Sequence, residues 1–520
     1  MLDLSLRGSV KKLTLLGLMV PLCAATAKGQ APTSEKFPAE LDRYIEKAMR
    51  DWEVPGLAIA VVRNDSVLVA KGYGVRELGK PDRVDANTVF NIASLTKSFT
   101  TAAAATLVDE GMISWDTPVH RLLPEYELRD SYLTQNVTLR DLLSHRTGFF
   151  AANQTFQLTN TTRAEIIRRA RFLPVSRPFR TEMVYSNIGF MIAGEALGRA
   201  AGMSYEDLVR RRVFTPLGMR STTISSAEFA RATNRVTPHA VIAGVQRPIR
   251  LSDIDIIAPA GAVNSTANDM ATWLRFQLGD GTFNGKRVIS ADQMWEMHSP
   301  QISFPVTAAM KRARLVKGWP GYGLGWQVMD YQGHPMLWHS GNGDGQPSIM
   351  ELFPDEHLGI VVMMNTWVAG LLHTRLINKI ADVYLNLPAR DWAGELLQRK
   401  EEIRNSDAQA IVRLRENRPP ERPSSHDLDA YAGSYIDSLY GEQAVRLQNG
   451  QLTMQMNGGE IADLSHWSYD TFLAMWRDPL YREEFPSLVT FSSDAQGRVT
   501  TLMMQLNRDR IVGTKAQPSQ

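Results

Sequence analysis

Leu-Ala-Ile-Ala-Val-Val-Arg at 57–63 and Ser-Val-Leu-Val-Ala-Lys-Gly-Tyr at 66–73 are two β-prone runs, with Asn64-Asp65 between them. Two such runs joined by turn-forming residues predict a β-hairpin. A helix is expected over 94–109, a stretch rich in alanine. Apolar residues that recur every three or four positions predict further helices at 138–144, 163–171, 186–200, 204–212 and 267–278.

Strand character returns later in the chain. Short β-type runs are predicted at 322–330, 335–340, 347–353 and 358–364, and a helix follows at 371–384. Strands therefore lie at both ends of a region whose middle is helical. This order predicts an α+β fold, in which helices and a helix-rich subdomain flank an antiparallel sheet built from both ends of the region.

The C-terminal part differs in composition. A charged helical stretch at 391–417 leads into Arg-Pro-Pro-Glu-Arg-Pro at 418–423, which is typical of a linker. Residues 428–507 alternate short β-type runs with Gly and Asn turns, and they predict a small all-β domain, a sandwich or a barrel. Because 520 residues exceed what one hydrophobic core usually holds, several domains are expected. We place them at 36–390 for the main domain, 391–424 for the linker and 425–515 for the β-domain.

The N-terminal segment has the pattern of a signal peptide. Three basic residues precede an almost entirely apolar run from Leu13 to Ala25, and Ala25-Thr26-Ala27 fits a small-x-small cleavage site. The apolar run is too short for a membrane span, so we expect a signal peptide over 1–27 and an exported protein, periplasmic or secreted. A short anchoring helix is the alternative. The single cysteine, Cys23, lies in this segment, so the mature chain would have no disulfide.

Charge and motif content exclude several classes of protein. The formal net charge of +2 is concentrated in the predicted signal peptide, and no long basic run follows, so neither nucleic acid nor an anionic membrane surface is an expected partner. The sequence has no G-x-S-x-G elbow of the α/β-hydrolases and no H-E-x-x-H zinc motif. No metal and no cofactor are expected, and the oligomeric state is left open.

Ser94-Leu95-Thr96-Lys97 is an S-x-x-K motif at the start of an expected helix. Side chains three positions apart share a helix face, so Ser94 and Lys97 should be neighbours. Free N–H groups and the positive dipole end at a helix N-terminus would favour a developing oxyanion. The alternative is an N-cap serine beside a solvated lysine. A second copy of the motif, Ser9 to Lys12, lies in the predicted signal peptide.

Tyr185-Ser186-Asn187 is a Y-x-N motif at the start of another expected helix. An ammonium nearby, such as that of Lys97, would lower the pKa of Tyr185, so that the phenol could take the Ser94 proton and return it to a leaving group. The Asn187 amide offers a donor and an acceptor to a substrate amide. A triplet of the same kind, Tyr384-Leu385-Asn386, suits a packed helix end instead.

His339-Ser340-Gly341 ends an apparent strand and enters a glycine-rich turn. Glycine there would let the backbone approach a substrate closely, and the N–H of Asn342 could pair with that of Ser94 as an oxyanion hole. His357-Leu358-Gly359 has the same spacing but is better explained as a hairpin connection. Isolated polar residues are expected to be structural: His145, His239 and His298, with Asp269 as a helix cap or loop anchor.

The order of these motifs, S-x-x-K, then Y-x-N, then H-x-G near the last strands, resembles the serine β-lactamases of class C and their relatives among D-Ala-D-Ala peptidases, D-aminopeptidases and esterases. Three further stretches resemble the same family: Leu-Leu-Ser-His-Arg-Thr-Gly at 142–148, Pro-Leu-Gly-Met at 216–219 and Ala260-Gly261. The resemblance covers about 38–385. The tail, about 425–515, resembles more loosely the lipocalin-like β-domain often appended to such enzymes.

The resemblance implies a role for each motif. Ser94 would form the acyl-enzyme, Lys97 and Tyr185 would move its protons, and Asn187 would hold the substrate amide. The N–H groups of Ser94 and Asn342 would stabilise the oxyanion, with His339, Ser340 and Gly341 lining the substrate. Class C β-lactamases carry lysine where this chain has His339. Because histidine is only partly charged near pH 7, it is a poorer partner for a substrate carboxylate, and this favours a peptidase, amidase or esterase.

We therefore expect a serine hydrolase that cleaves a small peptide, amide or ester through an acyl-enzyme on Ser94. The substrate would be a small molecule or a short peptide. Two other functions fit the same motifs: a penicillin-binding sensor that acylates with little turnover, and an acyltransferase. The β-domain is expected to restrict substrate size.

Overall fold

The computed structural model describes residues 36–517 apart from 150–157, 306–319, 368–370, 400–413, 415, 485–486 and 507–508. Phe37–Gln520 form one compact unit. The predicted signal peptide and most of the predicted helical stretch at 391–417 lie outside the described residues.

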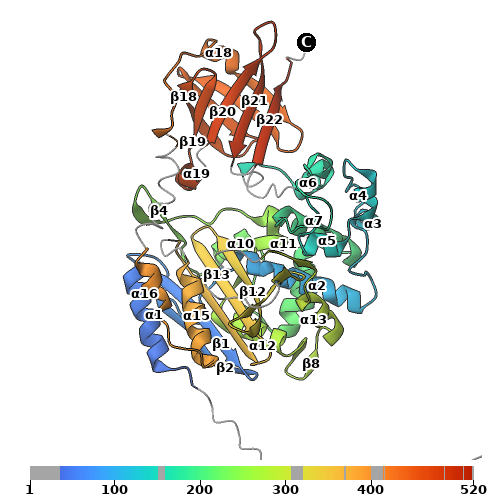
Figure 1. The fold of residues 1–520 in the computed structure, drawn as a ribbon, viewed down its shortest axis with the longest axis vertical. Coiled ribbons are helices and arrows are strands. Elements are labelled where there is room, and N and C mark those ends of the chain that lie inside the picture. The colour runs from blue at the N-terminus through green and yellow to red at the C-terminus, as the bar shows by residue number, and fades with distance from the viewer. Residues whose placement is uncertain are drawn as a thin grey trace, which may run out of the picture. The chain divides into compact units, whose positions relative to one another are not determined.

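An eight-stranded antiparallel sheet is the main structural element of the N-terminal region, in the order β2-β1-β14-β13-β12-β11-β10-β9 (Figure 1). Strand β1, from the start of the region, pairs with β14 from its end, with Leu57 opposite Met364. The α+β prediction and the prediction of a sheet built from both ends are confirmed. The strands are β1 (Gly56–Arg63), β2 (Ser66–Gly74), β9 (Ile302–Ser303), β10 (Gly321–Tyr322), β11 (Gln327–Tyr331), β12 (His334–Gly343), β13 (Gln346–Phe353) and β14 (Leu358–Met364).

Two turns show how the sequence shapes this sheet. Asn64 and Asp65 join β1 to β2 with φ of 49° and 61°, the left-handed pair that suits a tight hairpin. The run predicted as one strand at 322–330 is instead divided into β10 and β11. The chain bends at Gly325, whose φ is 75° and where a Cβ would lie 2.8 Å from the carbonyl oxygen of Lys97. Contact with the helix that carries Lys97 therefore interrupts the strand.

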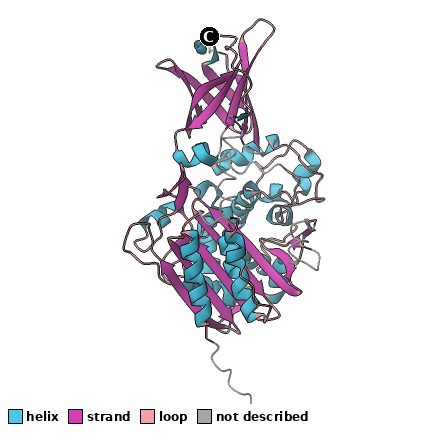
Figure 2. Ribbon diagram, turned by 60° about the vertical axis from the view of Figure 1, so that its left-hand side comes forward, coloured by secondary structure: helices cyan, strands magenta, loops and turns pink. Residues whose placement is uncertain are grey.

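The two faces of the sheet pack against different helices because side chains alternate along a strand. On β1, Leu57, Ile59 and Val61 belong to the same apolar cluster as residues of α1 (Ala39–Trp52) and α15 (Leu372–Tyr384). Figure 2 shows these helices lying across one face of the sheet. On the other face, Ala58 and Ala60 join the larger cluster that contains α2 (Thr96–Asp109) and α12 (Ala267–Leu278). We call these the outer and inner faces.

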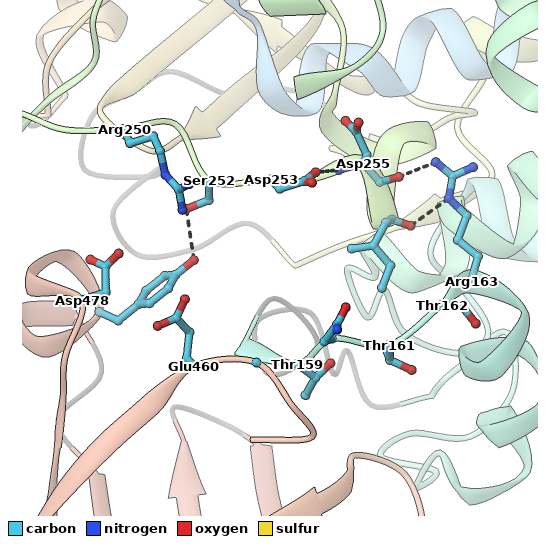
Figure 3. A pocket seen from close by; sticks show the side chains of 14 residues that line it. Thr159, Thr161, Thr162, Arg163, Arg250, Ser252, Asp253, Asp255, Glu460 and Asp478 are labelled. Carbon is cyan, nitrogen blue, oxygen red and sulfur yellow. Dashed lines mark hydrogen bonds between the residues drawn. The ribbon is translucent and has the colours of Figure 1, made fainter. Parts of the chain in front are cut away.

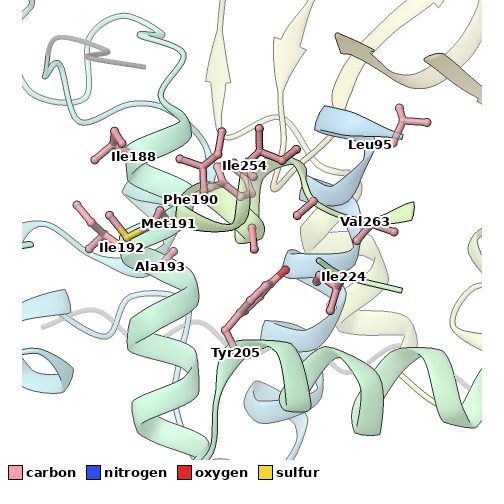
Figure 4. Packing of buried hydrophobic residues seen from close by; sticks show 14 of the residues in the cluster. Leu95, Ile188, Phe190, Met191, Ile192, Ala193, Tyr205, Ile224, Ile254 and Val263 are labelled. Atoms are coloured by element: carbon pink, nitrogen blue, oxygen red, sulfur yellow. The ribbon is translucent and has the colours of Figure 1, made fainter. Parts of the chain in front are cut away.

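In the sequence, a helix-rich subdomain lies between the first and last strands of the sheet, as predicted. At its centre lies α7 (Asn187–Ala201), whose apolar residues between Ile188 and Ala193 are labelled in Figure 4. They belong to the same apolar cluster as Leu95, Tyr205 and Val263. At Gly194 a Cβ would lie 2.3 Å from a ring carbon of Pro259, so glycine allows α7 to pack closely against α11. The remaining helices of the N-terminal region are α3 (Val119–Leu122), α4 (Ser131–Asn136), α5 (Leu139–Leu143), α6 (Arg163–Arg169), α8 (Tyr205–Val209), α9 (Thr215–Leu217), α10 (Ser226–Arg231), α11 (Ala258–Gly261), α13 (Ala291–His298) and α16 (Trp392–Leu397).

The C-terminal β-domain is a closed antiparallel barrel in which each strand pairs with its neighbour in sequence. The last strand pairs with the first, with Tyr435 opposite Lys515, so the barrel has no free sheet edge. The predicted barrel-like domain is confirmed, while its bounds and those of the other domains stay predictions. The strands are β15 (Gly433–Asp437), β16 (Gly441–Gln448), β17 (Gln451–Met456), β18 (Ile461–Ser468), β19 (Thr471–Trp476), β20 (Ser487–Ser493), β21 (Val499–Leu506) and β22 (Asp509–Lys515), with short helices α18 (Leu428–Tyr431) and α19 (Pro479–Glu484).

Candidate active site

Ser94 lies in a 3₁₀ turn, Ala93–Leu95, directly before α2. The helix predicted over 94–109 thus begins two residues later, at Thr96. Ala93 has a φ of 45°, a left-handed conformation that is unfavourable for a residue with a side chain. The Asn91 side chain supports this turn by accepting the Ala93 N–H at 3.1 Å and donating to Asn264 Oδ1 at 3.0 Å. Ser94 is therefore presented by a strained and well-supported turn.

Lys97 occupies the first turn of α2 and is fully buried, so the alternative of a solvated lysine is wrong. Its Nζ lies 3.1 Å from Ser94 Oγ, 2.8 Å from Asn187 Oδ1 and 2.9 Å from the carbonyl oxygen of Ala260. Burial lowers the pKa of Lys97 well below its ordinary value. Because the last two of these partners only accept hydrogen bonds, they can take both N–H groups of a neutral amine. The lone pair of the amine then faces the Ser94 hydroxyl.

Tyr185, of the Y-x-N motif, also contacts Ser94: its hydroxyl donates to Ser94 Oγ at 2.9 Å. Lys97 Nζ lies 4.7 Å from the centre of the Tyr185 ring. The expectation that Lys97 lowers the pKa of this phenol is wrong. Burial raises the pKa of Tyr185 above its ordinary value, and the hydrogen bond with Ser94 opposes it only in part. The reason is that burial disfavours both the phenolate and the ammonium, so the neutral pair is the stable one.

Asn187 is the first residue of α7, and the preceding Ser186 caps this helix by accepting the Gly189 N–H at 3.0 Å. The sequence predicts that the Asn187 amide binds substrate. In the structure the amide oxygen accepts a hydrogen bond from Lys97 and so helps to hold the amine. Ser94, Lys97, Tyr185 and Asn187 thus form one hydrogen-bonded cluster from two distant stretches of chain.

His339, on β12, is buried and lies beside this cluster, with its ring centre 6.3 Å from that of Tyr185. Its Nδ1 is 2.7 Å from the carbonyl oxygen of Ser340, and its Nε2 is 2.9 Å from the hydroxyl of Tyr322. The carbonyl can only accept, which assigns the ring proton to Nδ1 and makes Nε2 the acceptor. Burial, with repulsion from Lys97, lowers the pKa of His339 to about 3. The expectation of a partly charged ring near pH 7 is therefore wrong, and the imidazole is neutral.

Gly341 lets β12 lie against the turn that carries Ser94. A Cβ at this position would lie 2.3 Å from the carbonyl oxygen of Ile92 and 3.2 Å from the Cβ of Ala93. The close approach predicted for this glycine is thus to the protein's own backbone. Ser340 and Asn342 lie on either side of it on the same strand, opposite Ile349 and Pro347. Asn342 is in this way brought next to the turn of Ser94.

Two groups in the site were missed by the sequence analysis. The carbonyl of Ala260 holds Lys97, and the hydroxyl of Tyr322 holds His339. Tyr322 lies in the run at 322–330 that is predicted only as a strand, and no motif marks a backbone carbonyl. Asp269 is a loop anchor, as predicted, since it accepts from Ser221 N–H and Thr222 Oγ1 at 2.9 and 2.8 Å.

A separate polar cavity of about 450 Å³ is shown in Figure 3. Its lining includes Arg163, Arg250 and Ser252 with Glu460 and Tyr481 of the C-terminal region, and the Ser252 and Tyr481 hydroxyls lie 3.0 Å apart. Neither Ser94, Lys97 nor Tyr185 lines it, so this cavity is distinct from the cluster at Ser94.

The described residues contain neither a candidate metal site nor a candidate membrane-spanning helix. In this part of the chain no group of three or more His, Cys, Asp or Glu side chains has the arrangement of a metal site. Nor does any helix within the same described ranges combine the length and apolar character needed to cross a bilayer.

Comparison with known proteins supports the fold. Residues 41–383 match the family described as Beta-lactamase, and residues 417–517 match a domain of unknown function, DUF3471. The unguisins hydrolase ungD of Aspergillus violaceofuscus is 28% identical, over 79% of this chain and 77% of its own length. Penicillin-binding protein 4 of Amycolatopsis lactamdurans is also 28% identical, over 74% of this chain and 94% of its own length.

Solved structures show the same fold. The octameric penicillin-binding protein homologue from Pyrococcus abyssi has a TM-score of 0.59 at 20% identity and covers 91% of this chain and 99% of its own. The crystal structure of SurE has a TM-score of 0.54 at 18% identity, covering 92% and 98%. Since the family match spans most of the sequence and includes all three motifs, this chain belongs to the beta-lactamase family.

Proposed function

We propose that the protein is a serine hydrolase that forms an acyl-enzyme on Ser94 and cleaves a small peptide, amide or ester. One observation carries the proposal: the Ser94 hydroxyl lies 3.1 Å from a buried amine, Lys97 Nζ, and 2.9 Å from a partly buried phenol, Tyr185 OH. A nucleophile within hydrogen-bond reach of a base, which is itself oriented by further groups, is the arrangement that covalent catalysis requires.

The pKa shifts support one order of proton transfers. Neutral Lys97 accepts the Ser94 proton as Oγ attacks the carbonyl carbon of the substrate, and the N–H groups of Ser94 and Asn342 bind the oxyanion. The ammonium that forms then supplies a proton, through the Tyr185 hydroxyl, to the leaving nitrogen or oxygen as its bond to carbon breaks. Water attacks the ester, its proton passes to the same pair, and the Ser94 hydroxyl is restored.

The neutral state of His339 supports the choice of substrate class. Both ring nitrogens are engaged, by Ser340 and Tyr322, and burial keeps the pKa of His339 near 3. This side chain supplies no positive charge to a substrate carboxylate, so it favours acyl donors that are uncharged where they meet β12. The relative that is named as a hydrolase supports the proposal that the acyl-enzyme is hydrolysed.

Ser94→Ala tests the proposal with a panel of D-amino-acid amides, short acyl esters and a chromogenic cephalosporin. The Ser94→Ala variant should lose all turnover that the wild type shows. Ser98→Ala is the matched control, because the Ser98 hydroxyl is buried one turn along and donates only to the Leu95 carbonyl at 2.8 Å. Activity that survives in Ser94→Ala would refute the assignment of the nucleophile.

A sensor is the second candidate, and the relative named as a penicillin-binding protein favours it. Intact-protein mass spectrometry after mixing with a cephalosporin separates the two functions. An adduct on Ser94 that disappears within the turnover time indicates a hydrolase. An adduct that persists indicates a sensor, and transfer to an added amine indicates an acyltransferase.

We also propose that the protein is exported after cleavage near Ala27 and that the β-domain limits substrate size. N-terminal sequencing of the protein from a secreting host tests the first point. For the second, a chain ending near residue 420 should accept larger esters than the full chain does, and an unchanged size limit would count against it.

A further inference from the structure

His145 binds both backbone N–H groups that flank Tyr185. Its carbonyl oxygen accepts from Val184 N–H at 2.8 Å, and its Nδ1 accepts from Ser186 N–H at 3.1 Å. Because the two residues on either side of Tyr185 both donate to His145, the direction in which the phenol leaves the backbone depends on His145. Ser186 also caps α7, so the same contact fixes where that helix, and Asn187 with it, begins.

The imidazole ring also contacts the phenol itself. The ring centres of His145 and Tyr185 are 4.3 Å apart, and those of His145 and Tyr322 are 4.8 Å apart. Tyr185 donates to Ser94 Oγ, whereas Tyr322 contacts His339 Nε2. His145 is therefore packed against both phenols, the one that contacts Ser94 and the one that contacts His339.

This position is unfavourable for the fold in two ways. His145 has a φ of 60°, in the left-handed region that a side chain disfavours. Its Nε2 is buried and has no hydrogen-bond partner within the part of the chain that the structure describes. Since Nδ1 accepts from a backbone N–H, the ring proton must be on Nε2, which leaves a buried donor unsatisfied. Such features concentrate where a site imposes a geometry that stability alone would not select.

We infer that His145 is a positioning residue, whose neutral imidazole holds Tyr185 so that the phenol meets the Ser94 hydroxyl. This inference rests on the proposed function. The neutral form is essential because a second ring proton, on Nδ1, would face the Ser186 N–H and break that bond. The ionisable groups around the ring are Lys97, His339, Tyr185 and Tyr322. Burial, with repulsion from Lys97 and His339, keeps the pKa of His145 well below its ordinary value.

Three substitutions separate this role from simple packing. His145→Asn keeps an acceptor oxygen near the place of Nδ1 and tolerates a left-handed φ. His145→Gln extends its amide towards the place of Nε2, and His145→Ala removes the ring. The readout is the rate at which a fluorophosphonate probe, losing fluoride, labels Ser94, together with kcat and KM for p-nitrophenyl butyrate. Thermal melts show whether each variant is folded.

We expect His145→Ala and His145→Gln to lower the labelling rate and kcat about 100-fold, with KM changed little, and His145→Asn to recover most of that loss. His298→Asn is the matched control, since His298 is a partly buried histidine that contacts Gln277 Oε1 at 2.9 Å. This control should lower the melting temperature without slowing the labelling. If His145→Ala does not fold, the difference between Asn and Gln still decides the question.

A double-mutant cycle with Tyr185→Phe locates the effect. If His145 acts through the Tyr185 hydroxyl, His145→Ala should add less than about threefold to the loss that Tyr185→Phe already causes. Full additivity, or labelling at the wild-type rate in folded His145→Ala, would overturn the inference. Failure of the proposed function has a different signature, because the wild type would then not be labelled at Ser94 at all.

Discussion

The inner and outer faces of the sheet both bury ionisable groups, but with different consequences. Trp338 and His339 are neighbours on β12 and point to opposite faces. His339, Lys97 and Tyr185 gather on the inner face, where the hydrogen bonds of Lys97 and Tyr185 converge on Ser94 Oγ. On the outer face Glu351, opposite Trp338, is 3% exposed and lies on β13, which packs against α15.

The outer face resembles an active site in its pKa shifts alone. Burial, with repulsion from Asp382, raises the pKa of Glu351 to about 8. Asp382 itself accepts from Tyr331 OH and Trp392 Nε1, each at 2.6 Å. No serine or threonine hydroxyl takes part in these contacts, and one oxygen of Glu351 has no hydrogen-bond partner among the described residues. A strong shift therefore indicates a buried charge, whereas convergence on a reactive atom indicates chemistry.

Lys97→Met should break the inner face most severely. Methionine preserves the apolar stem but removes the base, so we expect the rate of Ser94 labelling by the fluorophosphonate probe to fall at least about 1000-fold. The melting temperature should stay the same or rise, because an amine buried without a carboxylate is costly to fold. A labelling rate within tenfold of the wild type would exclude Lys97 as the base.

Gly341→Ala should disturb the same face through the backbone. The new methyl group would lie 2.3 Å from the carbonyl oxygen of Ile92 and would push β12 away from the turn of Ser94. We expect kcat for p-nitrophenyl butyrate to fall about 100-fold, since small displacements of reacting groups are costly. Gly359→Ala on β14, where a Cβ meets only side chains, the nearest at 3.2 Å, is the control and should retain activity.

The pH dependence of acylation should follow the free amine. Neutral Lys97 is the reactive form, and burial lowers the pKa of Lys97. The labelling rate should therefore be flat above that pKa and fall about tenfold per pH unit below it. His339, with a pKa near 3, should not contribute to this limb. The limb should be absent from the residual rate of Lys97→Met, and its persistence there would assign it to another group.

Glu351→Gln should affect stability and leave activity unchanged. The pKa of Glu351 is about 8 in the folded protein and 4.5 in an unfolded chain, so wild-type stability from this group is complete below pH 4.5 and is lost as pH rises towards 8. Glutamine stays neutral throughout. The variant should match the wild type near pH 4.5 and exceed it by a few kcal/mol at pH 8, measured by urea unfolding. An unchanged pH dependence would contradict this assignment.

Local sequence patterns were sufficient to predict many helices and strands and to find the three motifs. The Asn64-Asp65 hairpin, the helix of Lys97 and the barrel strands each follow from short-range rules: turn chemistry, a period of two or a period of 3.6. The same rules identified Ser94, Lys97 and Tyr185, because i to i+3 spacing and helix starts are local features. Local patterns failed where a distant segment intervenes, as at Gly325, where contact with Lys97 divides a predicted strand.

Protonation states depended on the assembled fold. The motifs predicted that Lys97 would lower the pKa of Tyr185 and that His339 would be partly charged, and both expectations were wrong. The charge of a group depends on how much water it loses and which dipoles surround it, and these are supplied by segments far apart in the chain. Ala260, Tyr322 and His145 show the same dependence: each acts through a contact with a residue from another element. The sequence alone was enough to propose Ser94, Lys97 and Tyr185 as site residues. Their ionisation and orientation depend on the folded structure.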